Sequence, residues 1–224
     1  MINRKIEKEL QRFRDSHEKK ALLITGARQV GKTFIIREFG KQYESFAEIN
    51  FYENKAARAL FENAADSTDL LLRLSLIINV PLIPGKTLIF LDEVQECREI
   101  VTAIKFLVEE GSYQYILSGS LLGVDLKDIR SVPVGYMDVL EMYPLDLEEF
   151  AYANKVSPAV IDRLRRSFLD KTPVDDIIHE KMMELFRLYL IVGGMPAAVM
   201  RYLETNNLQI IGKRNGSGNV TCDE

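Results

Sequence analysis

The sequence predicts an α/β protein in which a central parallel sheet of about five strands carries helices on both faces and a helical appendage follows. Two observations support this prediction. Short segments with the apolar or alternating pattern of strands recur between segments of helical spacing, and this alternation implies crossover connections between parallel strands. Beyond residue 143 only helical patterns continue.

The segments of the sheet region follow one another in a regular order. Ile2, Ile6, Leu10 and Phe13 lie on one face of a first helix. Strands are expected at residues 21–25, 47–51, 87–91, 113–120 and 136–142. Helices are expected at residues 33–39, at about 54–63 and 68–79, and around 100–107, where Gly111 ends the last of them.

Residues after Pro144 have a different character. Helical patterns cover residues 145–155, 157–170 and 174–192, and Ser157 with Pro158 is a typical start of a helix. We therefore expect a boundary near residues 143–150. The expected parts are a core at residues 1–145, a helical appendage at residues 146–208, and a polar tail at residues 209–224 that is disordered because it has nothing to bury.

A short turn, Gly193-Gly194-Met195-Pro196, separates the last two helical segments. A helix–turn–helix of this kind occurs in winged DNA-binding modules. It also occurs where two helices pack and the first ends in a Schellman motif, which is the interpretation that we favour. The net charge of −4 and the isoelectric point near 5.4 agree, because they provide no general attraction to nucleic acid.

The composition excludes several other classes of protein. With 47% apolar and 28% charged residues among 224, the chain can bury a core, and no apolar run approaches the roughly 18 residues of a membrane span. The charged N-terminal region lacks the apolar stretch of a secretory signal, and its basic residues are interleaved with acidic ones, as on a solvated helix face. Cys97 and Cys222 are far apart, which indicates a reducing cytoplasm, and His17 and His179 lie in unrelated settings that build no metal site or catalytic triad.

A glycine-spaced turn follows the first buried strand. Residues 26–33 match G-x-x-x-x-G-K-[ST], the phosphate-binding loop, and stand between a strand and a helix as that motif requires. Its glycines allow successive N–H groups to face phosphate oxygens, and the helix N-terminus adds partial positive charge. The predicted nucleotide-binding residues are Gly26, Ala27, Arg28, Gln29, Val30, Gly31, Lys32 and Thr33.

Two of these residues receive definite roles. Lys32 would reach the β- and γ-phosphates, and the Thr33 hydroxyl would ligate Mg²⁺. Arg28 would face either phosphate or solvent. The alternative to the whole site is a glycine turn with an incidental surface lysine, which we consider the weaker interpretation.

An acidic pair, Asp92 and Glu93, directly follows the apolar strand at residues 87–91. Ligands of open α/β sheets bind outside the carboxyl ends of the strands, so this pair stands where charged groups serve chemistry. Asp92 would hold Mg²⁺ through a water, as the acidic residue of a Walker B motif, and Glu93 would orient and deprotonate an attacking water. The alternative is that the pair only ends a strand and caps the next helix.

The strand at residues 113–120 ends in Ser118, Gly119 and Ser120, beside the acidic pair if the two strands are neighbours. We predict that Ser118 is a sensor that contacts the γ-phosphate or the attacking water, against the alternative of an ordinary serine turn. Arg130 could act as an arginine finger, although a surface arginine explains it equally well.

Five segments together resemble the bacterial and archaeal ATP-binding proteins of the AAA superfamily. They are TGARQVGKT at 25–33, IFLDEVQEC at 89–97, YILSGS at 115–120, the stretch 132–150 and YLIVGGMP at 189–196, in the family's order. The resemblance spans about residues 2–208. It implies a P-loop NTPase three-layer sandwich of the additional-strand, catalytic-glutamate type, with the phosphate-loop strand in the sheet centre next to the sensor strand. It also implies ATP and Mg²⁺ as ligands, with Lys32, Thr33, Asp92, Glu93 and Ser118 in the roles above.

The chain departs from the family in two places. Tyr136 stands where members often carry an arginine after the glycine, so the resemblance supplies no arginine finger there. Members usually continue into a C-terminal domain of uncharacterised function, which the last dozen residues do not resemble, and we therefore expect a truncated or frame-shifted product.

The leading functional hypothesis is an ATPase that binds Mg·ATP at Gly26–Thr33 and hydrolyses it to ADP and phosphate with Glu93 as base. Its rival is a nucleotide-gated module with negligible turnover, whose helical appendage binds a protein partner. A small-molecule kinase is a weaker third hypothesis. An oligomer is compatible with the sequence, nucleic acid is unsupported by charge, and no membrane is expected.

Overall fold

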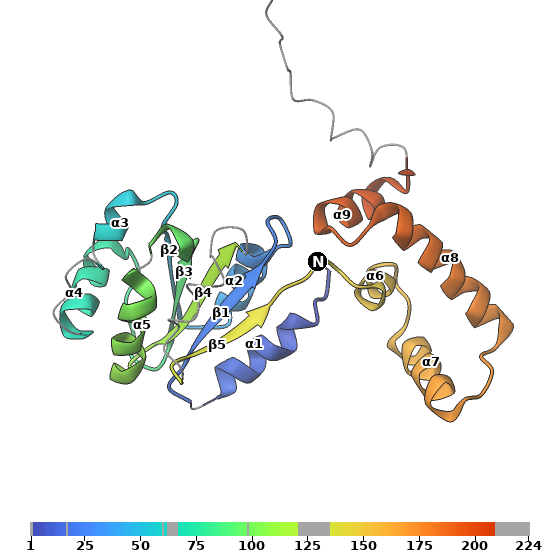
Figure 1. The fold of residues 1–224 in the computed structure, drawn as a ribbon, viewed down its shortest axis with the longest axis horizontal. Coiled ribbons are helices and arrows are strands. Elements are labelled where there is room, and N and C mark those ends of the chain that lie inside the picture. Colours follow the sequence, from blue (N-terminus) through green and yellow to red (C-terminus); the bar gives the residue numbers. More distant parts are fainter. Residues whose placement is uncertain are drawn as a thin grey trace, which may run out of the picture. The chain divides into compact units, whose positions relative to one another are not determined.

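Five parallel strands form a single sheet in the computed structural model, which describes residues 2–16, 18–59, 61, 67–97, 99–120 and 135–208. The strands are β1 (Ala21–Gly26), β2 (Ser45–Asn50), β3 (Thr87–Asp92), β4 (Gln114–Ser120) and β5 (Met137–Glu141). Their order across the sheet is β2-β3-β4-β1-β5, and every neighbouring pair is parallel (Figure 1). The predicted α/β class with a parallel five-stranded sheet is therefore confirmed.

Helices complete the layers around this sheet. They are α1 (Ile6–Asp15), α2 (Lys32–Gly40), α3 (Lys55–Ala59), α4 (Ser67–Ile77) and α5 (Glu99–Glu110), with a 3-10 turn η1 (Val94–Glu96) between β3 and α5. Helix α2 packs against β1, β3 and β4, whereas α4 and α5 contact each other. The expected helices and strands of this region are thus present, with ends that differ by a few residues.

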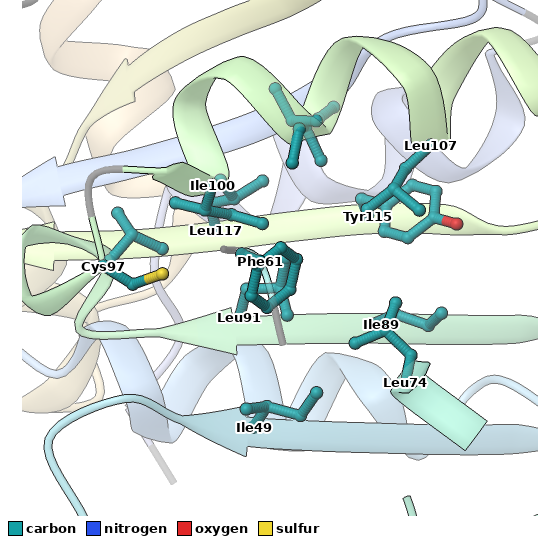
Figure 2. Packing of buried hydrophobic residues seen from close by; sticks show 14 of the residues in the cluster. Ile49, Phe61, Leu74, Ile89, Leu91, Cys97, Ile100, Leu107, Tyr115 and Leu117 are labelled. Atoms are coloured by element: carbon teal, nitrogen blue, oxygen red, sulfur yellow. The ribbon is translucent and has the colours of Figure 1, made fainter. Parts of the chain in front are cut away.

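One face of the sheet carries the larger apolar core. Its strand residues alternate along the chain, as in Ile89 and Leu91 of β3 and Tyr115 and Leu117 of β4, because successive side chains of a strand point to opposite faces. Helices α4 and α5 cover these residues with Leu70, Leu74, Ile100, Ile104 and Leu107, and Figure 2 shows part of this packing. The opposite face, which includes Phe90 and Ile116, is buried as well. Both faces are covered, as the apolar sequences of β1 and β3 predict.

The register of the sheet aligns the ends of the strands that carry polar residues. Asn50 of β2 lies opposite Asp92 of β3, and Gly26 of β1 lies opposite Ser120 of β4. Strand β4 lies between β1 and β3, so the sensor strand is next to the phosphate-loop strand, as the resemblance implied. The central strand is β4 itself, and β1 lies one place away from the centre.

The described residues form two compact units, one of which is Ile6–Tyr143 with the sheet just described. The other contains residues 2–5 together with 144–208 and is helical, with α6 (Leu147–Ala153), α7 (Pro158–Asp170), α8 (Asp176–Val192) and α9 (Pro196–Thr205). No strand occurs after residue 143 in the part of the chain that the structure describes. The expected disordered tail at 209–224 lies outside the described residues.

Buried Glu149 organises the start of the helical unit. Asp146 caps α6 by accepting a hydrogen bond from the Glu149 N–H (2.8 Å), and the Glu149 carboxylate accepts one from the Asp146 N–H (3.1 Å). The same carboxylate accepts hydrogen bonds from the Arg4 side chain (3.1 Å) and the Lys5 N–H (2.7 Å). This capping box therefore fixes residues 4 and 5 to α6.

The Gly-Gly turn between α8 and α9 is a site of close backbone packing. The Leu145 N–H donates to the Gly194 carbonyl (2.7 Å), and a Cβ at Gly194 would lie 2.2 Å from the Leu145 carbonyl oxygen. Gly193 has φ 74° and ψ −177°, a conformation essentially confined to glycine and different from the left-handed one of a Schellman motif. The Schellman prediction is wrong in this detail, although helix packing is what the turn provides.

Within the described residues no single helix is both long and apolar enough to cross a membrane. The helices α8 and α9 together meet the criteria of length and apolar composition, but the chain bends by 120° between them.

Candidate functional site

The loop between β1 and α2 has the backbone conformation of an anion cradle. Gly26, Gln29 and Gly31 have positive φ angles of 149°, 66° and 97°. Gly26 is also confined by sterics, because a Cβ there would lie 2.2 Å from the carbonyl oxygen of Met142, whose N–H donates to the Thr25 carbonyl (2.7 Å). The positive φ angles of the loop thus favour both glycines of the motif, and the nearby Met142 carbonyl leaves no room for a side chain at Gly26.

The loop leads directly into the N-terminus of α2. Gly31 is the N-cap residue, and no side chain in the described part of the chain caps this helix. The first N–H groups of α2 are therefore available to an anion, as at other helix N-termini that bind phosphate. Val30 is fully buried and anchors the loop between the two glycines.

Lys32 is buried, and its ammonium faces back into the loop. Its Nζ donates to the carbonyl oxygens of Gly26 and Ala27, both at 3.0 Å. Burial lowers the pKa of Lys32 from its ordinary value, while the charges of Glu93 and Asp92 oppose this shift and that of Arg28 adds to it. A lysine ammonium has three N–H donors, so this cation is held at the centre of the loop with donor capacity left for a phosphate.

Asp92 is the centre of a hydrogen-bond network at the carboxyl end of β3. Its Oδ2 accepts from the Thr33 hydroxyl (3.1 Å) and the Asn50 amide (3.2 Å). Its Oδ1 accepts from the Ser118 hydroxyl and from the Glu93 N–H (3.1 Å). The side chain is only 1% exposed, and burial raises the pKa of Asp92 against the opposing effect of the hydrogen bonds from Ser118 and Thr33.

The predicted metal ligands, Thr33 and Asp92, are in direct contact. A hydroxyl and a carboxylate oxygen are hard ligands of the kind that Mg²⁺ prefers, so the pair fits this ion. Among the described residues no group of three or more His, Cys, Asp or Glu side chains could hold a metal by itself.

Glu93 begins the turn η1 in a left-handed conformation, with φ 56° and ψ 47°. Its carboxylate accepts a hydrogen bond from the Gln95 side-chain amide. It lies close enough to Lys32 for its charge to oppose the lowering of the pKa of that lysine by burial. The structure therefore places the predicted base beside the loop, on a residue whose backbone is strained, as is common at functional sites.

The three positions considered for an arginine role are 28, 130 and 136. Arg28 is exposed and has no direct hydrogen bond in the described residues, whereas Arg130 lies outside the described range. Tyr136 precedes β5, and its carbonyl accepts from the Ala21 N–H (2.9 Å) at the amino end of β1. Since β1 runs about 16 Å from there to Gly26, position 136 faces the edge of the sheet away from the loop.

Two residues of this site had no predicted role. Asn50 joins Asp92 because β2 pairs with β3 in register, which only the strand order reveals. Ser120 lies opposite Gly26, and its hydroxyl is buried without a hydrogen-bond partner among the described residues. The hydroxyl of the predicted sensor, Ser118, in contrast donates a hydrogen bond to Asp92. The alternation of β4, which puts both serines on one face, was the available signal.

A sequence model of the AAA domain matches residues 18–151, more than half of the chain. The chain belongs to this AAA domain family. The resemblance drawn from its motifs is thereby confirmed, and the matched range contains the loop, the acidic pair and Ser118. No curated protein sequence matches the chain.

A solved structure of a Walker-type ATPase shares the fold. The Walker-type ATPase PABY2304 of Pyrococcus abyssi matches over 96% of this chain and 71% of its own, with 15% identity and a TM-score of 0.54. The ORC1 protein of Aeropyrum pernix in complex with DNA (94% and 81%, 13% identity, TM-score 0.43) and C. elegans PCH-2 (89% and 61%, 12% identity, TM-score 0.46) are more distant. The predicted P-loop NTPase class is confirmed by the first of these.

Proposed function

We propose that this AAA domain binds Mg·ATP at Gly26–Thr33 and hydrolyses it to ADP and phosphate. The observation that carries the proposal is the contact of Thr33 and Asp92 beside the buried ammonium of Lys32. Free N–H groups at the start of α2, a cation inside the loop and two oxygen ligands for a divalent ion together match the charge of a triphosphate.

The reaction would use the groups of the site as follows. Lys32 and the N–H groups of the loop bind the β- and γ-phosphates and neutralise their charge. Glu93 takes a proton from water as the water oxygen bonds to the γ-phosphorus. The bond from that phosphorus to the bridging oxygen breaks, and ADP leaves with the electron pair. Mg²⁺ at Thr33 and Asp92 would supply further positive charge at the phosphates.

Two serines have separate roles in this proposal. Ser118 holds Asp92 in place through its hydroxyl, which already has an acceptor. Ser120, at the carboxyl end of β4, has a buried hydroxyl without a hydrogen-bond partner among the described residues and is the better candidate for contact with the γ-phosphate or the water. In this proposal Ser118 acts on the site indirectly, through its hydrogen bond to Asp92, and not by contact with the γ-phosphate or the water.

Steady-state phosphate release tests the proposal. We expect Glu93→Gln to keep Mg·ATP affinity and to lose turnover by about 100-fold or more, because an amide cannot accept the proton of the water. Equal turnover of the wild type and the Glu93→Gln variant would remove the role of Glu93. A wild type that neither binds nor hydrolyses ATP would remove the proposal itself.

A second candidate is a nucleotide-gated module that binds a protein partner with negligible turnover. It is favoured by the apolar side chains that the helical unit exposes: Phe168 (83% exposed), Ile177 (79%), Leu190 (66%) and Ile191 (64%). Large apolar side chains that a unit leaves exposed are candidates for contact with a partner. Intact Mg·ATP binding with turnover at the background rate would favour this candidate.

The net charge of −4 lends no support to nucleic acid as the partner. The cytoplasm remains the proposed location, on the ground of the two isolated cysteines.

A further inference from the structure

The turn that follows Asp92 is fixed at both ends. At its start, the Glu93 carbonyl accepts from the Glu96 N–H (3.0 Å), and Glu93 itself is left-handed. At its end, the Cys97 N–H donates to the Val94 carbonyl (3.0 Å), and the Cys97 side chain is packed in the core beneath α5 (Figure 2). Gln95, in the middle of this turn, is thus held in a defined place beside Glu93.

The side chain of Gln95 bridges Glu93 and the tip of β4. Its amide nitrogen donates to Glu93 Oε2, and its carbonyl oxygen accepts from the Ser120 N–H (3.3 Å). The carboxylate can only accept and the N–H can only donate, so one orientation of the amide satisfies both neighbours. No other side chain type of this length offers one donor end and one acceptor end without charge.

Gly119 leaves the room that this bridge needs. A Cβ at Gly119 would lie 3.2 Å from Gln95 Oε1 and 3.4 Å from the nearest methyl group of Val94. The bridge formed by Gln95 therefore depends on two separate elements: the turn η1 after β3, which carries Gln95, and Gly119 near the end of β4. Either can be altered separately.

We propose that Gln95 is a positioning residue for Glu93. By occupying Oε2 of the carboxylate, it directs the other oxygen, which accepts no hydrogen bond within the described residues, to the attacking water. Because the same amide is bound to the backbone of Ser120, the orientation of Glu93 follows the position of the tip of β4, which also carries the free hydroxyl. This inference rests on the proposed hydrolysis.

Steady-state kinetics of Gln95→Met test the inference, because methionine keeps the length of the side chain and removes both hydrogen bonds. We expect kcat to fall on the order of 10- to 100-fold, as for a misplaced catalytic group. The KM for ATP and the Kd for Mg·ATP should stay within about threefold, since Gln95 touches no group assigned to binding. Gln42→Met, which alters an exposed glutamine bound to Gln11 and Arg14, is the matched control and should leave kcat unchanged.

Two further variants separate positioning from folding. Gly119→Ala, which presses on the bridge without removing it, should lower kcat by a smaller factor. Adding Gln95→Met to Glu93→Gln should cause no further loss, because a residue that acts only through Glu93 has nothing left to position.

Each outcome is decisive. Wild-type turnover with equal turnover of Gln95→Met would overturn the role of Gln95 and leave the proposed hydrolysis intact, as would a rise in kcat or an additive loss in the double variant. Absence of turnover in the wild type would overturn both.

Discussion

The two ends of the same sheet are both rich in charged residues, yet they differ in how these charges are held. At the amino ends of the strands, a cavity of about 630 Å³ is lined by residues such as Lys20, Glu44 and Lys86. Charged side chains here form ion pairs on the surface, such as Lys86–Glu44 (2.7 Å), where both side chains are more than half exposed. Exposed pairs of this kind contribute little to the stability of the fold.

At the carboxyl ends, Lys32 and Asp92 are buried, and the groups that bind them directly are neutral. Lys32 is held by carbonyl oxygens, and Asp92 is held by hydroxyl, amide and N–H donors. Burial lowers the pKa of Lys32 and raises the pKa of Asp92, so it favours the neutral form of both side chains. Two residues other than glycine, Gln29 and Glu93, have positive φ angles there. Buried charge and backbone strain, rather than the size of a cavity, therefore mark the candidate site.

The sharpest contrast between the two ends concerns glycine. Gly26→Ala should lower the free energy of unfolding by about 3 kcal/mol or more, because it adds a clash with the Met142 carbonyl to a strained φ. Gly85, before β3, also has a positive φ of 74°, but a Cβ there meets nothing within 4 Å. Gly85→Ala should cost only about 1 kcal/mol. Urea unfolding measures both, and equal losses would contradict the close packing of Gly26.

The next largest effect is on ligand affinity. Lys32→Ala should weaken Mg·ATP binding by about 100-fold, since charged hydrogen bonds contribute about 1.5–3 kcal/mol each. Calorimetric titration measures the Kd. Unchanged affinity would mean that the ammonium in the loop does not meet the phosphates.

Asp92→Asn should stabilise the ligand-free fold by about 1 kcal/mol while it abolishes turnover, a trade-off common at functional sites. Burial raises the pKa of Asp92 above its ordinary value of 3.8, so the folded state binds this proton more tightly than the unfolded state does. Ionisation of Asp92 therefore destabilises the folded wild type progressively as the pH rises from 3.8 through the folded-state pKa. Above the folded-state pKa this loss of stability is complete.

The gain from Asp92→Asn should accordingly be largest near neutral pH and vanish as the pH falls towards 3.8. Thermal unfolding in the presence of a chelator, recorded across this pH range for both proteins, measures it. A gain that persists at the acid end would show that charge is not its cause.

The smallest effect is expected at the amino ends. Lys86→Ala should change the free energy of unfolding by less than about 0.5 kcal/mol, because its partner Glu44 is exposed and screened by solvent. Turnover and Mg·ATP affinity should equal those of the wild type. A loss of affinity here would move the binding site towards the amino-end cavity.

Much of this arrangement could be predicted from the sequence, because motifs of contiguous residues determine it. The loop at 26–33 and the acidic pair were recognisable from residue types and from the apolar strands before them. The strand order was available only through the resemblance. The contact of Asn50 with Asp92 and the bridge from Gln95 to Ser120 depend on the register of β2 with β3 and on the left-handed Glu93, which no local pattern encodes.

The assignment of Ser118 illustrates the same limit. Its place at the end of an apolar strand was correctly predicted, but its hydroxyl could not be assigned a partner until β3 and β4 were known to be neighbours. The Gly193 turn was misjudged for a related reason, since its conformation follows from the approach of Gly194 to Leu145 rather than from the helix end alone.

Hydrogen exchange of backbone amides with and without Mg·ATP distinguishes the two ends of the sheet in one experiment. Slower exchange at residues 26–35, with no change at residues 42–44, 85–86 and 111–114 around the amino-end cavity, is the predicted result. Protection confined to the amino-end residues, or none anywhere at saturating nucleotide, would contradict the assignment of the triphosphate to the loop.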